Sequence, residues 1–261
     1  MIRASTGVTH EHSLSGEKLS LLAVFAHSED ESFGPAGTLA KYASEGIEVS
    51  LVAATRGHPV EASKEATARH RDRSCECRAY GIRRACLFDY HRGALSQIAL
   101  EMIVERLVRL IREVRPQVIV TFAPEGLTGD ADNRIISVAA TTAFREASDA
   151  TRFEQHLHEG LSAYAPQKLY YCVLPASLVT HWGVGEFNSV PDDQITTTLD
   201  VSAYGEAMKN ALYCQRHRAL DFIRWLTEDR RIEWNAEYYA LVESRLPKKS
   251  RREEDLFAGL R

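Results

Sequence analysis

The chain has 261 residues, of which 44% are hydrophobic and 26% charged, the proportions of an ordinary globular protein, so global disorder is excluded. The net charge is −4 and the basic residues are scattered, which argues against nucleic acid as the main partner. No apolar run reaches the roughly 20 residues that span a bilayer, so no membrane span is expected. We expect one domain over 1–261, with a loose leader at 1–18 and a charged, solvated tail at 247–261.

The five cysteines are an odd number, and three lie in stretches with the pattern of buried helix or strand. Reduced thiols and a cytoplasmic location are therefore expected. Cys75 and Cys77 are spaced C-x-C within a helical pattern, which points their side chains to different faces and disfavours a shared metal. The sequence is compatible with a homo-oligomer.

Short apolar runs and amphipathic stretches predict strands and helices that alternate along the chain. In chain order, we expect a strand at 19–26, helix at 36–45, strand at 47–54, helix at 61–80, strand at 85–88, helix at 98–114, strand at 118–122, helix at 135–147, strand at 168–174, edge strand at 195–201, and helices at 203–226 and 236–244. This alternation predicts an α/β fold: a Rossmann-like, doubly wound, mostly parallel sheet flanked by helices, with a small C-terminal extension.

Doubly wound sheets bind their ligands at the carboxyl ends of the strands. Four polar loops follow predicted strands and would meet at that edge. They cover residues 27–31, 55–58, 89–93 and 125–133. We therefore expect the functional residues to lie in these loops.

The first of these loops reads Ala-His-Ser-Glu-Asp-Glu and ends a buried strand. His27 and Asp30 on one tight turn can both reach a cation, while Glu29 between them can deprotonate a water molecule. An equally weighted interpretation is a surface turn whose acidic residues complement the N-terminus of the next helix. The spacing alone does not choose between the two.

This loop resembles the A-H-P-D-D-E signature of the LmbE/PIG-L family of zinc-dependent N-deacetylases, and the stretch from Gly37 resembles that family's G-G-T-L-A. Residues 54–57 resemble its T-x-G loop, and 69–82 resemble its R-x-x-E-L-x-x-A-x-x-x-L-G-V pattern. The resemblance also covers 89–93, Arg115-Pro116 and 128–133, and is strong over about the first 150 residues. It implies the family's fold and amide hydrolysis of an N-acetylated amino sugar.

The resemblance carries individual roles to residues of this chain. His27 and Asp30 would be the first two metal ligands, and Asn133 occupies the position of the third. Glu29 stands where the family has its general-base Asp, and Asp130 stands at a position that polarises the oxyanion. Glu29 and Asp130 are therefore the expected catalytic residues.

Three arginines are expected to bind the substrate. Arg56 and Arg69 can hold a sugar or an acidic group, with loop or helix salt bridges as an equal alternative. Arg92 sits where many relatives carry an Asp, and Gln215 sits where many carry a His. The expected partner is a small amino-sugar or glycoside substrate.

The family's third ligand is a histidine, whereas Asn133 offers only a neutral carbonyl oxygen, which suits hard cations better than zinc. The expected cofactor is accordingly zinc held weakly, another divalent metal, or none. His58 is a candidate compensating ligand, although a solvated loop histidine is the commoner case. An anionic Asp130 would repel an oxyanion unless it were protonated or turned toward the metal.

Three functional hypotheses follow. The leading one is a metal-dependent amide hydrolase that removes an acyl group from an N-acetylated amino-sugar-like substrate, with Glu29 moving the proton. The alternative is a catalytically impaired or repurposed relative that binds a sugar-like ligand without hydrolysis. A nucleotide-dependent Rossmann enzyme ranks last, because no G-x-G-x-x-G or P-loop follows the first strand.

Overall fold

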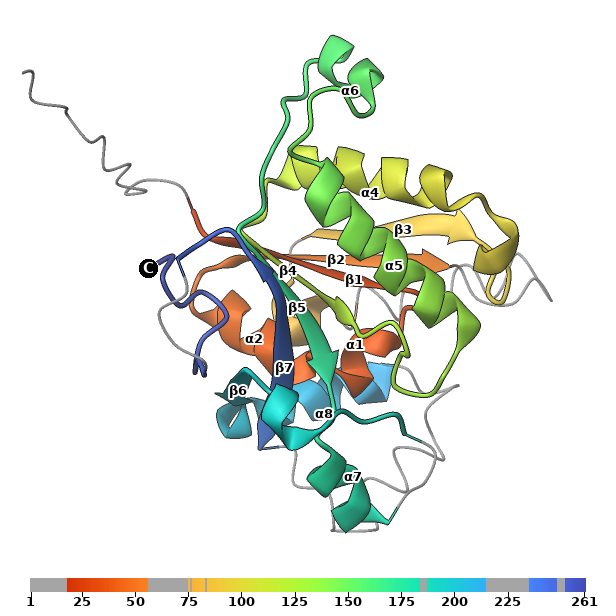
Figure 1. The fold of residues 1–261 in the computed structure, drawn as a ribbon. Coiled ribbons are helices and arrows are strands. Elements are labelled where there is room, and N and C mark those ends of the chain that lie inside the picture. The colour runs from red at the N-terminus through yellow and green to blue at the C-terminus, as the bar shows by residue number, and fades with distance from the viewer. Residues whose placement is uncertain are drawn as a thin grey trace, which may run out of the picture.

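The computed structural model describes residues 18–55, 75, 77–82, 84–183, 187–214, 235–247 and 252–261. Within these residues seven strands form one sheet in the order β3-β2-β1-β4-β5-β7-β6 (Figure 1). The strands are β1 (Ser20–Phe25), β2 (Glu48–Thr55), β3 (Arg84–Tyr90), β4 (Val118–Phe122), β5 (Lys168–Val173), β6 (Thr197–Asp200) and β7 (Ala236–Ser244). Strands β1 to β5 are parallel, and β7 is antiparallel to β5 and β6. The predicted α/β fold with a mostly parallel sheet is confirmed.

Helices lie on both faces of this sheet. They are α1 (Asp30–Phe33), α2 (Ala36–Ser44), α4 (Leu100–Val114), α5 (Ala131–Glu146), α6 (Glu154–His158), α7 (Ala176–Trp182) and α8 (Gly205–Cys214), with short 3-10 turns η1 (Leu95–Gln97), η2 (Asp192–Gln194) and η3 (Ser202–Tyr204). Of the helix expected at 61–80, only Cys75 and 77–80 lie within the described residues, and they are helical up to Gly81. None of the described helices is long and apolar enough to cross a membrane.

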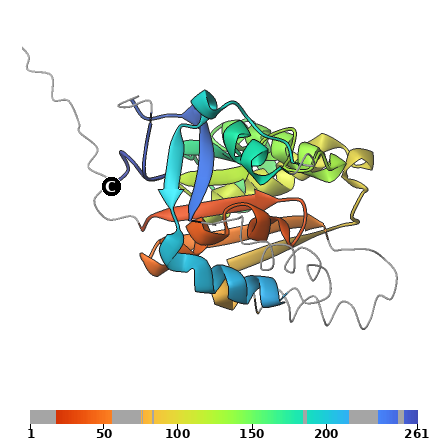
Figure 2. The same cartoon turned by 90° about the horizontal axis from the view of Figure 1, so that it is seen from below.

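Strand β1 shows how the layers form. Its side chains alternate between the two faces of the sheet, as the period of a strand requires. Leu21, Ala23 and Phe25 pack with α2 and α8 on one face, and Leu22 and Val24 pack with α4 and α5 on the other. Figure 2 shows the sheet between these two helical layers. A strand buried on both faces requires the continuous apolar run from which β1 was predicted.

The prediction of a helix at 236–244 is wrong, because these residues form the strand β7. Ala, Glu and Leu in the segment favour a helix in isolation, but tertiary pairing overrides such weak preferences. Every second residue early in the strand is buried, including Glu237 and Tyr239, and the backbone pairs with β5 on one side and β6 on the other. A strand inserted between two strands cannot be recognised from its own composition.

The expectation of a solvated tail at 247–261 is wrong for its last ten residues. Leu256 and Phe257 are fully buried. The Phe257 ring packs edge-on against Tyr42 of α2 at 5.1 Å between centroids. Lys168 of β5 donates to Glu253 at 2.9 Å, so an ion pair also fixes the segment. Two of the charges that suggested solvation, Glu253 and Asp255, are partners of the buried side chains of Lys168 and Tyr42.

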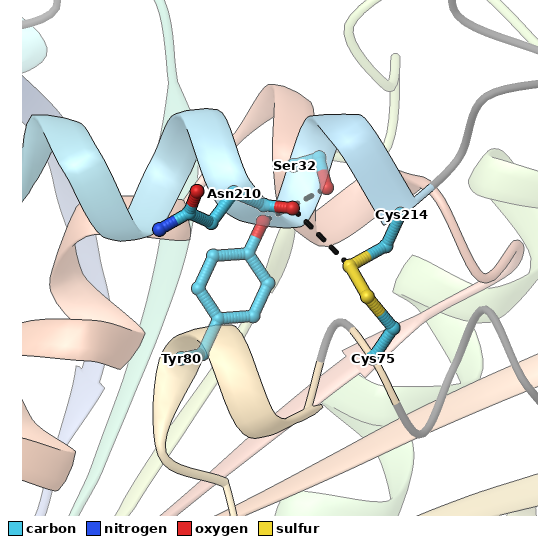
Figure 3. Close-up of a disulfide and its surroundings, with 5 residues drawn as sticks. All are labelled: Ser32, Cys75, Tyr80, Asn210 and Cys214. Carbon is cyan, nitrogen blue, oxygen red and sulfur yellow. Dashed lines mark hydrogen bonds between the residues drawn. A yellow bond between two sulfur atoms is a disulfide. The ribbon is translucent and has the colours of Figure 1, made fainter.

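The expectation of reduced thiols is wrong for two of the five cysteines. Cys75 and Cys214, 139 residues apart in sequence, form a disulfide with their Cα atoms 5.7 Å apart (Figure 3). Cys77, Cys86 and Cys172 are in no disulfide. The C-x-C spacing correctly separated Cys75 from Cys77, but a pairing across 139 residues is set by the fold and cannot be predicted from spacing.

A buried carboxyl on β7 holds the start of α2. Glu237 accepts hydrogen bonds from the backbone N–H groups of Gly37 and Thr38 at 2.7 and 2.9 Å. Burial raises the pKa of Glu237 to about 7, against the opposing effect of these hydrogen bonds. The carboxyl therefore serves as a helix cap supplied from a distant strand.

This shift predicts a pH dependence of stability. Between pH 4.5, the ordinary pKa of the group, and about 7, the folded state binds the Glu237 proton more strongly than the unfolded chain does. The group's contribution to the free energy of unfolding therefore falls as pH rises through this window and is constant above it. In urea titrations from pH 5 to 8, the stability of the wild type minus that of Glu237→Gln should decrease up to about pH 7. Glu243→Gln on the same strand is the control, and a pH-independent difference for Glu237→Gln would contradict the assignment.

Candidate active site

The functional residues expected from the sequence gather at the carboxyl edge of the parallel strands. His27 follows β1, Thr55 ends β2, Arg92 follows β3, and Asp130 follows β4. The strands run parallel in adjacent positions of the sheet, so their carboxyl ends open at one edge. The predicted location is therefore correct for the described loops.

The orientation of His27 is set by a threonine. The Thr55 hydroxyl donates to the carbonyl oxygen of Ala26 at 3.0 Å and lies 2.7 Å from Nδ1 of His27. A hydroxyl has one hydrogen, so Thr55 can only accept from the histidine. Nδ1 therefore carries the ring proton, and Nε2 presents its lone pair.

That lone pair faces two carboxylates. Nε2 of His27 lies 3.4 Å from Oδ1 of Asp130 and 4.0 Å from Oδ2 of Asp132. These three residues offer ligand atoms that all lie within 4.8 Å of one another. Burial, followed by the positive charge of Arg92, lowers the pKa of His27, which disfavours a second ring proton. A neutral imidazole facing carboxylates is stabilised by a cation between them, so the group fits a divalent metal ion.

Asp130 is the N-cap of α5. Its Oδ1 accepts from the backbone N–H groups of Asp132 and Asn133 at 2.8 and 3.2 Å. Burial opposes ionisation, but the hydrogen bonds from the backbone N–H groups of Asn133 and Asp132 outweigh it and hold the pKa of Asp130 below its usual value. Asp130 is thus an anion, held at a helix N-terminus whose dipole favours negative charge.

Asp132 was not among the residues singled out from the sequence. It is almost fully buried, and its two oxygens accept from the backbone N–H groups of Gly93 at 2.5 Å and Leu95 at 3.0 Å. It thereby ties the loop after β3 to the start of α5. The sequence offers one signal for Asp132, its D-x-D spacing with Asp130. Two acids with this spacing at the start of a helix can act as the helix cap and as a metal ligand.

Asp30 and Asn133, the other two expected ligands, are both buried. Oδ2 of Asp30 accepts from the backbone N–H of His27 at 2.8 Å, and burial, then the charge of Glu29, raises the pKa of Asp30 to about 8. The side-chain oxygen of Asn133 is buried without a hydrogen-bond partner. A buried oxygen in this state is costly unless something outside the protein satisfies it. Metal binding by Asp30 and Asn133 stays a prediction, and the orphaned oxygen supports it for Asn133.

Glu29 and Arg92 form an ion pair across the site, between the loops that follow β1 and β3. The Glu29 side chain is 14% exposed and that of Arg92 is 34% exposed, so both can be reached from the solvent. An ion pair with a guanidinium favours the carboxylate form of an acid, which is the form that accepts a proton. The geometry brings the expected base next to the His27 turn.

Other residues expected in the site lie outside the described residues. They are Arg56, Arg69, His58 and Gln215. Their roles in binding substrate or metal remain predictions.

A cavity of about 780 Å³ lies beside this edge of the sheet. Phe33 and Gly34 at the end of α1, together with Leu127 in the loop after β4, form one wall, and Trp182 of α7 and Glu237 of β7 line the rest. His27, Asp130 and Asp132 do not line this cavity. Leu127 belongs to the loop that also carries Asp130, and Phe33 belongs to the helix α1 that carries Asp30, so both segments contribute to its wall.

The chain was compared with protein families and with individual known proteins. Residues 22–144 match the family described as GlcNAc-PI de-N-acetylase. The 1D-myo-inositol 2-acetamido-2-deoxy-alpha-D-glucopyranoside deacetylase of Thermomonospora curvata is 30% identical, over 92% of this chain and 96% of the relative. The enzyme of the same name from Streptomyces griseus is also 30% identical, over 92% and 88%.

Two solved structures share the fold at low sequence identity. N,N'-diacetylchitobiose deacetylase from Pyrococcus horikoshii has a TM-score of 0.68 at 16% identity, over 85% of this chain and 83% of that one. GalB, the 4-carboxy-2-hydroxymuconate hydratase from Pseudomonas putida, has a TM-score of 0.61 at 19% identity, over 89% and 99%. These likenesses concern the fold alone, and the second shows that the fold also serves a reaction that is not deacetylation.

At the carboxyl edge of this α/β sheet, a histidine and two aspartates form a group whose ligand atoms lie close enough together to hold a metal ion. The chain belongs to the LmbE/PIG-L family of N-deacetylases.

The bridging role of Asp132 can be tested by removing its carboxylate. Asp132→Ala leaves the N–H group of exposed Gly93 and that of buried Leu95 without their acceptor, so the free energy of unfolding should fall by about 1–3 kcal/mol, mainly through Leu95. Urea denaturation measures this loss. Asp193→Ala, at an exposed aspartate, should change stability by less than about 0.5 kcal/mol. Equal stability of the two variants would show that Asp132 does not tie the loop to α5.

Proposed function

We propose that the protein hydrolyses the acetamide of an N-acetylated amino sugar, in a site formed by His27, Glu29, Asp130, Asp132 and Asn133. The observation that carries the proposal is the Nε2 lone pair of His27, which faces two carboxylates because Thr55 fixes the proton on Nδ1. The names of the curated relatives, which are deacetylases of a glucosamine-containing inositol glycoside, support this class of substrate.

The residues that would hold a divalent ion are His27, Asp130 and Asp132. The orphaned oxygen of Asn133 and the carboxyl group of Asp30, which would lose its proton on binding a metal, are the further candidates. When bound, such an ion polarises an amide carbonyl and makes water more acidic. One nitrogen among several oxygens suits zinc less well than an all-imidazole set and suits harder cations better. We propose zinc as the family's metal, with weaker retention in this chain.

Glu29 is the residue that we propose as the base. Its carboxylate takes the proton of the attacking water and delivers it to the departing amine nitrogen, so one group serves both transfers. Arg92 keeps Glu29 in the carboxylate form before the substrate arrives. Asp130 is ionised and cannot donate to an oxyanion, so its geometry favours a ligand's role over the polarising role implied by its position in the family.

A second candidate function is ligand binding without hydrolysis. It is favoured by Asn133 at the position of the third ligand and by the ion pair that engages Glu29. The two candidates differ in whether chelation abolishes a measured activity.

The role of Glu29 is tested by Glu29→Gln, which preserves shape but cannot accept a proton. Turnover of N-acetylglucosamine conjugates should fall by about 10²–10⁴-fold, while metal retention is unchanged because Glu29 is outside the metal group. Acetate release and elemental analysis measure the two quantities. Glu206→Gln on the exposed surface of α8 is the matched control. Full turnover by Glu29→Gln would show that Glu29 is not the catalytic base.

The donor set is tested by metal retention after zinc loading and desalting. Asp130→Ala should lose zinc, because it removes one member of the three-residue group. Asn133→His should retain more than the wild type, because an imidazole replaces a neutral oxygen. Elemental mass spectrometry gives the stoichiometry, and Glu125→Ala, an exposed acid in the same loop, is the control. Retention that is indifferent to Asp130→Ala would place the metal elsewhere or nowhere.

A further inference from the structure

Helix α1 carries Asp30 and directly follows Glu29, yet it cannot hold its own conformation. It has four residues, and no side chain caps its N-terminus. Helices of this length are unstable in water without tertiary packing. The position of the catalytic turn therefore depends on the elements that surround α1.

One neighbour is the short helical stretch that ends at Tyr80. The Tyr80 hydroxyl lies 2.9 Å from the hydroxyl of Ser32 in the middle of α1, and both residues are buried. A second neighbour is α8, which packs against both α1 and α2, and β1 and α2 also contact α1. Figure 3 shows the Ser32–Tyr80 contact beside the α8 helix.

The Cys75–Cys214 disulfide joins these two neighbours to each other. Cys75 lies five residues before Tyr80, and Cys214 is the last residue of α8. Its sulfur also contacts the carbonyl oxygen of Asn210 at 3.2 Å, one turn earlier in α8 (Figure 3). Two of the elements that contact α1 are thus covalently linked to each other.

We propose that the disulfide and Tyr80 position α1, and that reduction of the disulfide lowers the activity of the enzyme by releasing the catalytic turn. Tyr80 acts as a positioning residue, because it reaches Glu29 and Asp30 only through α1. The activity part of this proposal rests on the proposed deacetylase function, whereas the structural part does not.

The chemistry needs a dithiol as reductant. Cys75 and Cys214 are both half-buried, so a small thiolate can reach the bond. It attacks one sulfur and forms a mixed disulfide, and the second thiol of the reductant then displaces the enzyme sulfur. Two electrons and two protons pass to the enzyme, which gains two thiols, and the reductant leaves as its own disulfide.

Hydrogen exchange tests the structural part on the full-length protein, with dithiothreitol as the reductant. Reduction should speed amide exchange in the peptide over 27–34, while the peptide over β4 stays protected. Alkylation followed by intact mass should show two additional reactive thiols after reduction. Absence of the bond in protein purified without reductant, or unchanged exchange over 27–34 after reduction, would overturn the proposal.

Kinetics test the activity part. Reduction, and the double substitution Cys75→Ser/Cys214→Ser, should lower kcat for an N-acetylglucosamine conjugate by about 10- to 100-fold, since small misplacements of catalytic groups have effects of this size. KM should stay within about twofold, because the loss falls on the transition state. Re-oxidation should restore kcat in the wild type only. Cys86→Ser, at a half-buried cysteine in no disulfide, should behave as the wild type does.

Tyr80→Phe separates positioning from general stability. It keeps the aromatic ring and the disulfide but removes the hydroxyl that meets Ser32. We expect faster exchange over 27–34 and a several-fold lower kcat without a comparable loss in melting temperature. If kcat falls only in proportion to the melting temperature across all variants, Tyr80 and the disulfide stabilise the fold and do not position α1. If the wild type turns over no substrate, the deacetylase function fails, and the exchange experiment still decides the positioning.

Discussion

The hydrogen bond from His27 to Thr55 governs what the site can bind. Because the Thr55 hydroxyl is already committed to the carbonyl oxygen of Ala26, the imidazole has one permitted tautomer. The free lone pair is thereby aimed at Asp130 and Asp132. Without that restraint the ring could turn a proton toward the carboxylates, and the same residues would form a closed ion-pair network with no need of a cation.

The strands that build this edge were predictable, because burial on both faces leaves continuous apolar runs such as that of β1. The turn at His27 was predictable as well, since its polar residues directly follow such a run. Strand β7 was not, because its partners β5 and β6 determine its conformation. Nor was Asp132, whose two acceptors serve backbone groups 37 and 39 residues earlier in the chain, a relation that no local pattern encodes.

The chain keeps the architecture of the LmbE/PIG-L family but differs from the family's motifs at the residues that we propose as metal ligands. Asn133 puts an amide oxygen where the family resemblance implies a histidine, and Arg92 adds a positive charge that pairs with Glu29. The site is therefore a balance between fixed charges of both signs, and its affinity for a cation depends on how far Arg92 already neutralises the acids.

The placement of β7 has a consequence for how the chain folds. It follows β6 in sequence but lies between β5 and β6 in the sheet, so β6 gains a partner only after β7 has docked. Until then the edge of β5 presents unpaired backbone groups over its whole length. An exposed edge of this kind can pair with strands of other molecules. Because β7 docks late, aggregation during refolding should increase with protein concentration.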